Sequence, residues 1–364
     1  MPELPEVQTI VSDLNKKIKG DTIVGFWSDW KKAVKNISAK KFGEEIQGRR
    51  ILEARRIGKN IFIDLSGNKT IYIHLKMTGH LLVKSKIQNL KSQINPKFSP
   101  KADQHQAGNF QKKSKEKKSP LASPSYPTGQ ALLKKGENEN YFDEKVNQYV
   151  RHIFYLKTRN PKRKSHNVKR ETQNPSLILP LKRGGDNNIK YDKTLEFSDL
   201  RKFGKIVLAD ADKLESLKEI KSLGIDALSR KFTLKRFKEI LKKRQNSLIG
   251  IILMDQNLIA GIGNIYRSEI LFDAKILPTR KAVSLKPAEI KSLYGSIKKI
   301  LKKAVKMRGT SDSDYRDTSG APGKFQKNLK VYRRDGEKCQ KCGSIIKKVK
   351  LGQRSAYYCS GCQK

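Results

Sequence analysis

Four cysteines near the end of the chain have the spacing of a metal site. They form two Cys-x2-Cys pairs separated by sixteen residues, and they are all the cysteines of the sequence: Cys339, Cys342, Cys359 and Cys362. Two such pairs supply four soft thiolate ligands, the donor set of structural zinc. Two local disulfides are the alternative, which a reducing cytosol disfavours. We predict one structural Zn²⁺ ion, with Arg354 of the hairpin between the pairs available to a phosphate.

The N-terminus, MPELPEV, brings an imino acid and two carboxylates together. If Met1 is removed, Pro2 presents a free secondary amine. An α-amino group titrates near pH 8, so on the order of a tenth of it is neutral and nucleophilic at pH 7. Attack on a sugar C1′ carbon would give an iminium ion, with Glu3 and Glu6 as proton carriers beside it. The alternative is that Pro5 and Glu6 are ordinary residues in the first turn of a helix.

A Gly-x-Gly turn lies within QNLIAGIGNIYRSE, residues 256–269. Gly261 and Gly263 predict a tight turn between two helices, with Asn264 as the N-cap of the second. Free backbone N–H groups and the helix dipole at such a turn favour an anion, and a DNA phosphate fits that description. The alternative is a turn required only for helix packing.

The charge balance points to a polyanionic partner. The chain has 79 Lys and Arg against 35 Asp and Glu, a formal net charge of +44. Nucleic acid is the first expectation and an anionic membrane surface the second. No apolar run is long enough to span a bilayer, and no signal-peptide pattern follows the first residue, so we expect a cytoplasmic protein.

Apolar periodicity divides the chain into a β-rich part and a helical part. Within residues 2–20, apolar side chains recur every three or four positions from Val7 to Ile18, which predicts a helix that begins almost at once. Short β-branched runs then predict an antiparallel sandwich or barrel up to about residue 212. Two basic stretches, at about 84–145 and 158–190, have few apolar residues, and we expect disordered insertions there. Four helices are predicted after residue 212, ahead of a polar loop and the cysteine module.

Four segments in this order resemble the formamidopyrimidine-DNA glycosylase family: PELPEV, RRIGKN, the Gly-x-Gly turn and the four-cysteine ribbon. The resemblance implies an α+β, multi-domain fold. It comprises an N-terminal β-sandwich with its helix (1–212), a helix-two-turn-helix domain (213–308), a lesion-recognition loop (309–330) and a zinc ribbon (331–364).

The resemblance also implies roles for the candidate catalytic residues. Pro2 would be the nucleophile that displaces a damaged base and forms a Schiff base. Glu3 would be the general acid and base beside it, and Glu6 a supporting carboxylate. Lys59, in RRIGKN, matches a β-hairpin lysine that approaches the lesion phosphate and assists strand cleavage.

Further residues match the family's DNA contacts. Met77 would fill the gap left by the flipped base, Arg201 would pair with the orphaned cytosine, and Phe203 would wedge the opposite strand. Without the family context, Met77 and Phe203 are expected in a core and Arg201 on the solvated surface. The remaining matches are phosphate contacts, and they are His74, Asn264 and Arg354.

The activity implied is that of a bifunctional DNA glycosylase and AP lyase of base excision repair. It would remove 8-oxoguanine and formamidopyrimidines from double-stranded DNA as a monomer, then cleave the strand by β,δ-elimination. The loop 309–330 resembles a lid that closes over the everted base, with Thr310, Asp314 and Tyr315 as possible contacts. Gly250 stands where family members commonly carry a lysine. A glycosylase for oxidised pyrimidines, of endonuclease VIII type, and a non-catalytic damage-binding protein stay open as alternatives.

Overall fold

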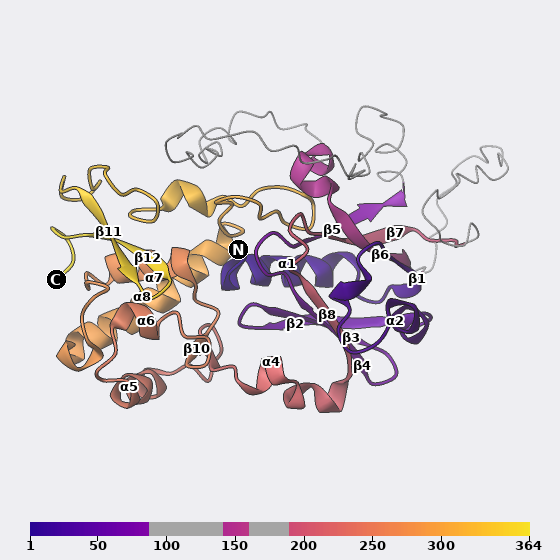
Figure 1. The fold of residues 1–364 in the computed structure, drawn as a ribbon, viewed down its shortest axis with the longest axis horizontal. Helices are drawn as coiled ribbons and strands as arrows, with labels where there is room; N and C mark the ends of the chain where they lie inside the picture. Colours follow the sequence, from indigo (N-terminus) through magenta and orange to yellow (C-terminus); the bar gives the residue numbers. More distant parts are fainter. Residues whose placement is uncertain (87–140, 160–188) are drawn as a thin grey trace, which may run out of the picture.

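The computed structural model describes residues 1–86, 141–159 and 189–364. The molecule has two lobes side by side along its long axis, a β-sandwich lobe and a helical lobe that carries the C-terminal ribbon (Figure 1). The N-terminus lies between the two lobes, so residues at the start of the chain can meet residues from both. None of the helices in the described ranges is long and apolar enough to cross a membrane.

Helix α1 (Leu4–Lys17) opens the chain and is stabilised at both ends. Glu3 is its N-cap in a capping box with Glu6, a proline stands in its first turn, and two lysines stand in its last turn. Its apolar face is buried in the core of the β-sandwich. The sequence pattern predicted this helix, and the capping box explains why it begins so close to the N-terminus.

Two four-stranded antiparallel sheets form the sandwich, which confirms the predicted strand architecture. Each sheet combines strands that are distant in sequence, in the orders β1-β6-β7-β5 and β2-β3-β4-β8. The strands of the first are β1 (Thr22–Ser28), β6 (Val150–Lys157), β7 (Lys193–Ser198) and β5 (His80–Ser85). Those of the second are β2 (Ile51–Ile57), β3 (Asn60–Leu65), β4 (Lys69–His74) and β8 (Lys205–Asp210). Helix α2 (Ala39–Ile46) packs beside β1.

The first insertion, expected at about 84–145, is shorter at both ends. Strand β5 runs to Ser85, because Lys84 forms a buried ion pair with Glu196 of the neighbouring strand at 2.9 Å. Residues 141–145 are also described, and Phe142 among them is buried, with the ammonium of Lys84 5.4 Å from the centre of its ring. The rest of that insertion, and residues 160–188 of the second, lie outside the described residues.

The helical lobe follows the predicted order of helices. Its helices are α5 (Leu234–Lys243), α6 (Ile249–Ile252), α7 (Asn264–Asp273) and α8 (Pro287–Lys306). The one-turn α4 (Lys218–Lys221) was not predicted and packs on the sandwich lobe, where its Glu219 pairs with Lys205 of β8. The second predicted helix is a single turn, α6, because the chain bends at once into a short parallel pairing of β10 (Ile259–Ala260) with β9 (Ile225–Asp226). The ribbon is the hairpin of β11 (Ile346–Leu351) and β12 (Arg354–Cys359), and β12 packs on α7.

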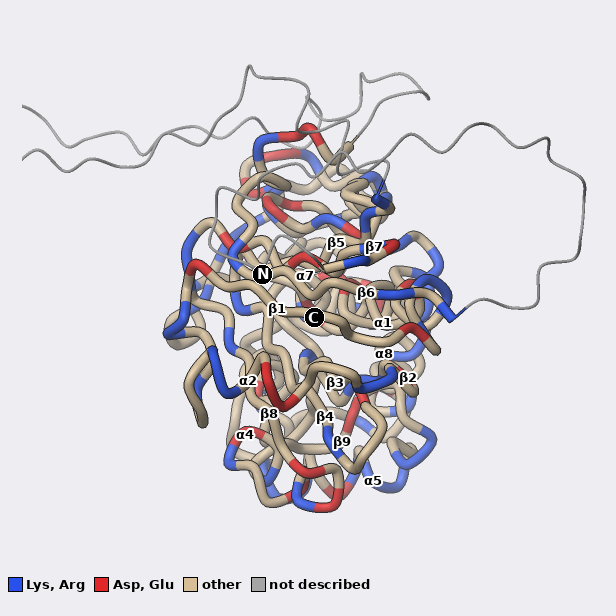
Figure 2. The backbone as a smooth tube through the Cα atoms, turned by 90° about the vertical axis from the view of Figure 1, so that its right-hand side faces the viewer, with Lys and Arg blue, Asp and Glu red and all other residues tan. Residues whose placement is uncertain are grey.

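Short 3₁₀ helices complete the described connections. They are η1 (Lys31–Ala33), η4 (Tyr141–Asp143), η5 (Lys145–Gln148), η6 (Ala211–Ser216), η7 (Ala282–Ser284) and η8 (Phe325–Asn328). Lysine and arginine are spread around the outside of the sandwich lobe, with acidic segments between them (Figure 2).

The loop 309–330 is packed against the sandwich lobe in this structure, instead of standing free as an open lid. The N–H of Val83, in β5, donates to the carbonyl of Thr318 at 2.9 Å. Arg308 bonds both Asp13 of α1 and Asp317 of the loop. Tyr315 belongs to the sandwich core, so the expectation that its side chain faces a bound base is wrong for this conformation. The apolar ring gains more from burial there than from exposure to solvent.

Candidate active site and nucleic-acid interface

Glu3 links the N-terminal segment of the chain to the N-terminus of α7 in the helical lobe. Its carboxylate accepts hydrogen bonds from the N–H groups of Gly263 at 2.8 Å and Ile265 at 2.9 Å, and a longer one from Tyr266 at 3.4 Å. The backbone N–H of Leu4 donates to the carbonyl of Gly261 at 3.0 Å. The helix dipole favours a negative charge at this position, so the second residue after Met1 is held in one orientation.

This contact corrects two expectations about the Gly-x-Gly turn. The N-cap of α7 is Gly263, and Asn264 is the first helical residue. The anion on the free N–H groups is the carboxylate of Glu3 and not a DNA phosphate. The glycines are needed because the N-terminal segment comes so close: a Cβ at Gly263 would lie 2.3 Å from the carboxyl carbon of Glu3, and one at Gly261 would lie 2.5 Å from Leu4.

Glu6 is buried beside Glu3 and holds its own set of donors. It accepts from the hydroxyl of Tyr266 at 2.5 Å, from the N–H of Thr310 at 2.7 Å and from the N–H of Glu3 at 2.7 Å. Burial, and then the charge of Glu3, raise the pKa of Glu6 to about 7. Glu6 can therefore exchange a proton at neutral pH, in a site that also binds the start of the loop 309–330.

Lys59 enters the same site from the turn between β2 and β3. Burial lowers the pKa of its ammonium, and the carboxylates of Glu3 and Glu6 act in the opposite direction. The turn is fixed from the helical lobe, since Asp226 accepts from the N–H of Gly58 at 2.7 Å and also pairs with Arg56. Lys59 is buried and forms no ion pair with a carboxylate among the residues that the structure describes, so it is well placed to meet an anion or to move a proton.

Pro2 is buried and directly precedes Glu3, and Met1 before it has 39% of its surface exposed. The sequence-predicted catalytic set therefore comes together from α1 and the β2–β3 turn. The amine of Pro2 is in a peptide bond as long as Met1 is attached.

Met77, Arg201 and Phe203 meet on the surface of the sandwich lobe. An Nη1 of Arg201 donates to the sulfur of Met77 at 3.4 Å, and its guanidinium lies over the ring of Phe203, 4.8 Å from the centroid. Met77 is 38% and Phe203 50% exposed, which excludes the alternative that they are core residues. The buried carboxylate of Asp199 holds their loop by accepting from the N–H groups of Phe203 and Gly204.

His74 ends β4 near Lys59 as a neutral imidazole. Burial, and then the nearby cations Lys76, Lys59 and Lys205, together lower its pKa to about 3. Its Nδ1 accepts from the N–H of Lys76 at 2.9 Å, so the ring proton is on Nε2. This residue can offer one hydrogen bond to a phosphate and no charge.

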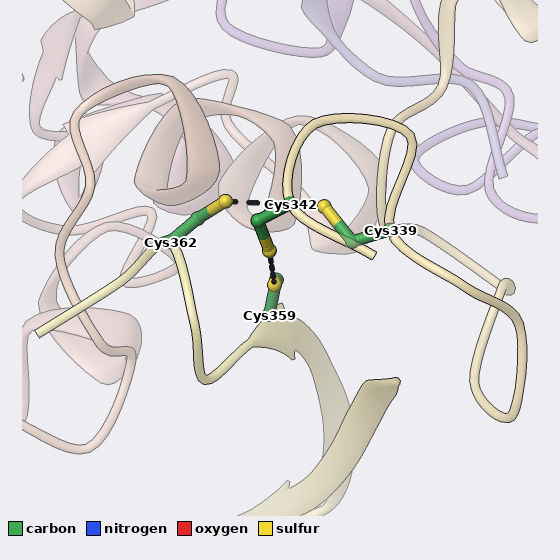
Figure 3. Close-up of side chains that lie close together, drawn as sticks. All are labelled: Cys339, Cys342, Cys359 and Cys362. Carbon is green, nitrogen blue, oxygen red and sulfur yellow. Dashed lines mark hydrogen bonds between the residues drawn. The ribbon is translucent and has the colours of Figure 1, made fainter. Parts of the chain in front are cut away.

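The four cysteines converge as the spacing predicted (Figure 3). Their sulfurs all lie within 4.8 Å of one another, with 3.4 Å between those of Cys342 and Cys359 and 3.9 Å between those of Cys339 and Cys362. A tetrahedral ion with metal–sulfur bonds of about 2.3 Å needs sulfur separations of about 3.8 Å, so the cage fits zinc. All four cysteines are free thiols in this structure, which excludes the alternative of two local disulfides.

Two residues of the site were not found from the sequence. Asp226, which holds the turn of Lys59, looked like any acidic loop residue. Arg267 of α7 is completely buried beside Asn264, although arginine on a helix is usually a surface residue. The signal for Arg267 was present: the surrounding run IYRSEIL has no polar face, and all of it is buried.

Three family models match the chain. Residues 1–117 match the formamidopyrimidine-DNA glycosylase N-terminal domain, and residues 223–316 match the formamidopyrimidine-DNA glycosylase H2TH domain. Residues 336–364 match a zinc finger found in FPG and IleRS. The predicted resemblance is confirmed, and the four-cysteine module is a zinc-finger domain.

Proteins named formamidopyrimidine-DNA glycosylase are similar over the full length. That of Pelotomaculum thermopropionicum is 32% identical, with 100% of this chain and 99% of the relative covered. That of Carboxydothermus hydrogenoformans is also 32% identical, with 100% of both covered. Two solved Lactococcus lactis FPG complexes share the fold at 25% identity and 100% coverage of both chains. One contains N7-benzyl-Fapy-dG DNA (TM-score 0.68) and the other oxidised-pyrimidine DNA (TM-score 0.67).

Proposed function

The chain belongs to the formamidopyrimidine-DNA glycosylase family, and we propose that it removes oxidised purines from double-stranded DNA and then cleaves the strand. One observation carries this proposal. Lys59 of RRIGKN is buried where the carboxylates of Glu3 and Glu6, both from PELPEV, act on its pKa, and Pro2 directly precedes Glu3 in the chain. The protein would act as a monomer in the cytoplasm, on 8-oxoguanine and formamidopyrimidine lesions.

Base excision begins on the amine that Pro2 presents once Met1 is removed. The nitrogen lone pair forms a bond to C1′ of the damaged nucleotide, and the C1′–base bond breaks with its electron pair leaving on the base. Glu3 lies beside Pro2 and exchanges protons with the sugar and the amine. The attached nitrogen then loses its one proton, and the C1′–O4′ bond breaks with its electron pair going to O4′, which takes a proton from Glu3. The product is a cationic iminium between Pro2 and C1′, and its nitrogen has no further proton to lose.

Strand cleavage follows from that cation. The iminium withdraws electrons and acidifies the C2′ proton, whose removal expels the 3′ phosphate by β-elimination. A second elimination expels the 5′ phosphate. Lys59 supports both steps by stabilising the departing phosphates, and Glu6, whose pKa is about 7, buffers protons in the closed site.

The exposed group of Met77, Arg201 and Phe203 fits the task of holding the duplex open. A flexible thioether, a guanidinium and an aromatic ring can replace the stacking and pairing of a base that has left the helix. His74, Asn264 and Arg354 are proposed to hold the backbone on either side. The zinc-finger ribbon presents Arg354, and a Zn²⁺ ion held by its four cysteines would supply the rigidity that a small core cannot.

Oxidised pyrimidines are the second candidate substrate. Gly250 removes a lysine that family members commonly carry, and the similar Lactococcus lactis FPG has been seen with oxidised-pyrimidine DNA. Against this stands the PELPE start of the chain, which resembles the purine-excising branch.

Borohydride trapping on a panel of lesion duplexes tests the proposal. We expect a covalent protein–DNA adduct with 8-oxoguanine opposite cytosine, stronger than with thymine glycol. Pro2→Gly, and protein that retains Met1, are expected to lose most of the adduct. If DNA is bound in a salt-dependent way but no lesion gives an adduct, the protein is a damage-binding protein and the enzymatic proposal is wrong.

A further inference from the structure

Arg267 is a buried cation for which the proposed reaction has so far no use. It stands in α7 with 1% of its surface exposed. One of its terminal nitrogens donates to Oδ1 of Asn264 at 2.6 Å and to the carbonyl of Ser355 at 2.8 Å. The other donates to the carbonyl of Gly250 at 3.3 Å. The guanidinium therefore joins α6, the start of α7 and the start of β12.

The guanidinium of Arg267 contacts no carboxylate among the described residues. All three acceptors are neutral, and its Nε is buried without a hydrogen-bond partner among the described residues. Burial lowers its pKa to about 10, with Glu3 nearby acting to raise it and Arg354 to lower it. The group is thus a cation at neutral pH. Burying an unpaired charge costs several kcal/mol, so an anion from outside the chain would stabilise this position.

Gly250 explains why the cation comes from α7. A Cβ at residue 250 would lie 2.7 Å from Leu351 of the ribbon and 2.8 Å from the carbonyl oxygen of Pro278, so no side chain can start there. The lysine that family members commonly carry at this position is sterically excluded in this chain. The guanidinium of Arg267 ends on the carbonyl of Gly250 and brings a positive charge to the same place.

Arg267 also fixes the direction of two neighbouring donors. A guanidinium can only donate, so the Asn264 atom that it contacts is the amide oxygen, and the NH₂ group of Asn264 must point away from it. The bond to the carbonyl of Ser355 holds the start of strand β12, directly after Arg354. Both proposed phosphate contacts therefore depend on one buried side chain.

We propose that Arg267 is a positioning residue for the DNA backbone: it aims Asn264 and Arg354 at a phosphate and supplies the charge that is missing at Gly250. This inference rests on the proposed function, because the phosphate is that of lesion-containing DNA. In this chain the positive charge near the phosphate is supplied from α7, by Arg267, instead of from residue 250 in α6.

Binding to a duplex with a tetrahydrofuran abasic analogue tests the proposal. Arg267→Met keeps the apolar length of the side chain and removes the charge, and we expect roughly a tenfold loss of affinity. Asn264→Ala should weaken binding in wild-type protein but add almost nothing to Arg267→Met, since the asparagine is already misdirected. Arg50→Met, at an exposed residue of the sandwich lobe, changes the net charge equally and should leave the affinity within about twofold.

A purely structural role predicts a different result. It would lower the melting temperature of Arg267→Met while the folded protein kept wild-type affinity, or would make the two substitutions additive; either overturns the proposal. If Arg267→Met does not fold, Arg267→Lys replaces it. This variant keeps the charge but cannot hold Asn264, so adding Asn264→Ala to it must again cause almost no further loss of affinity. If wild-type protein itself fails to bind and to trap lesion DNA, the proposed function fails instead.

Discussion

Gly263→Ala tests whether the N-terminal segment and α7 make one active site. The φ angle of Gly263 is −128°, so alanine adds no backbone strain, and only its methyl group matters. That methyl carbon would lie 2.3 Å from the carboxyl carbon of Glu3 and 2.4 Å from one of its oxygens. Real contacts of this kind are longer than about 3 Å, so the carboxylate has to leave its position.

The size of the effect follows from the bonds that are lost. Glu3 would give up its hydrogen bonds from the N–H groups of Gly263 and Ile265, at 2.8 and 2.9 Å. Hydrogen bonds to a charged group contribute about 1.5–3 kcal/mol each, and water recovers part of that, so we expect a loss of about 3 kcal/mol in the free energy of unfolding. A misplaced general acid slows proton transfer by about a hundredfold or more, and the rate of borohydride trapping should fall accordingly.

Gly295→Ala is the matched control. Gly295 lies on the exposed side of α8, and no atom lies within 4 Å of the place that a methyl group would take there. Alanine should therefore stabilise the helix by about 0.5–1 kcal/mol and leave trapping unchanged. The double variant Glu3→Gln, Gly263→Ala should trap no more slowly than Glu3→Gln alone. A folded Gly263→Ala protein that traps at the wild-type rate would refute the claim that Glu3 is placed by α7.

Three further predictions concern the same region and the ribbon. Burial raises the pKa of Glu6 from 4.5 to about 7, so between these values the folded state binds more protons than the unfolded state, and stability falls as the pH rises. Relative to wild type, Glu6→Gln should therefore gain about 3 kcal/mol between pH 4.5 and pH 7.5 in denaturant titrations; a constant difference would contradict the burial argument. Asp226→Asn weakens the acceptor for the N–H of Gly58 and leaves Arg56 buried without its ion pair, which should lower the free energy of unfolding by about 3 kcal/mol. It should also slow strand nicking more than adduct formation, because it loosens the turn that carries Lys59. Equal slowing of both would argue against the role of the β2–β3 turn in strand cleavage. Cys342→Ser should reduce bound zinc well below one equivalent and weaken DNA binding while the sandwich lobe keeps its hydrogen-exchange protection, and full zinc content would contradict the four-sulfur site.

Local patterns in the sequence were sufficient for the elements of the fold. Apolar periodicity predicted α1, the strands of the sandwich and the order of the helices, because each depends on residues close to one another. The cysteine spacing predicted the sulfur cage for the same reason, since each pair forms its own turn. The family resemblance added the candidate residues that no local pattern could connect.

Contacts between distant segments could not be predicted in this way. The Gly-x-Gly turn was correctly interpreted as an anion site, but nothing in its neighbourhood indicates that Glu3, 260 residues away from Gly263, supplies the anion. Tyr315 was expected at a lid surface, whereas the loop that carries it docks on the sandwich and buries the ring. Asp226 and Arg267 act across element boundaries, where one-dimensional periodicity carries no information.

The bond between Glu3 and α7 has a consequence for the order of biosynthesis. The first residues of the chain leave the ribosome long before residues 263–266 have been made, and domains fold as they emerge. During that time Pro2 has neither a fixed carboxylate beside it nor a helix terminus to orient that carboxylate. A chain that stops within the sandwich lobe would carry the proposed nucleophile but could not assemble the site around it. Incomplete copies of the protein are therefore expected to leave the genome uncut.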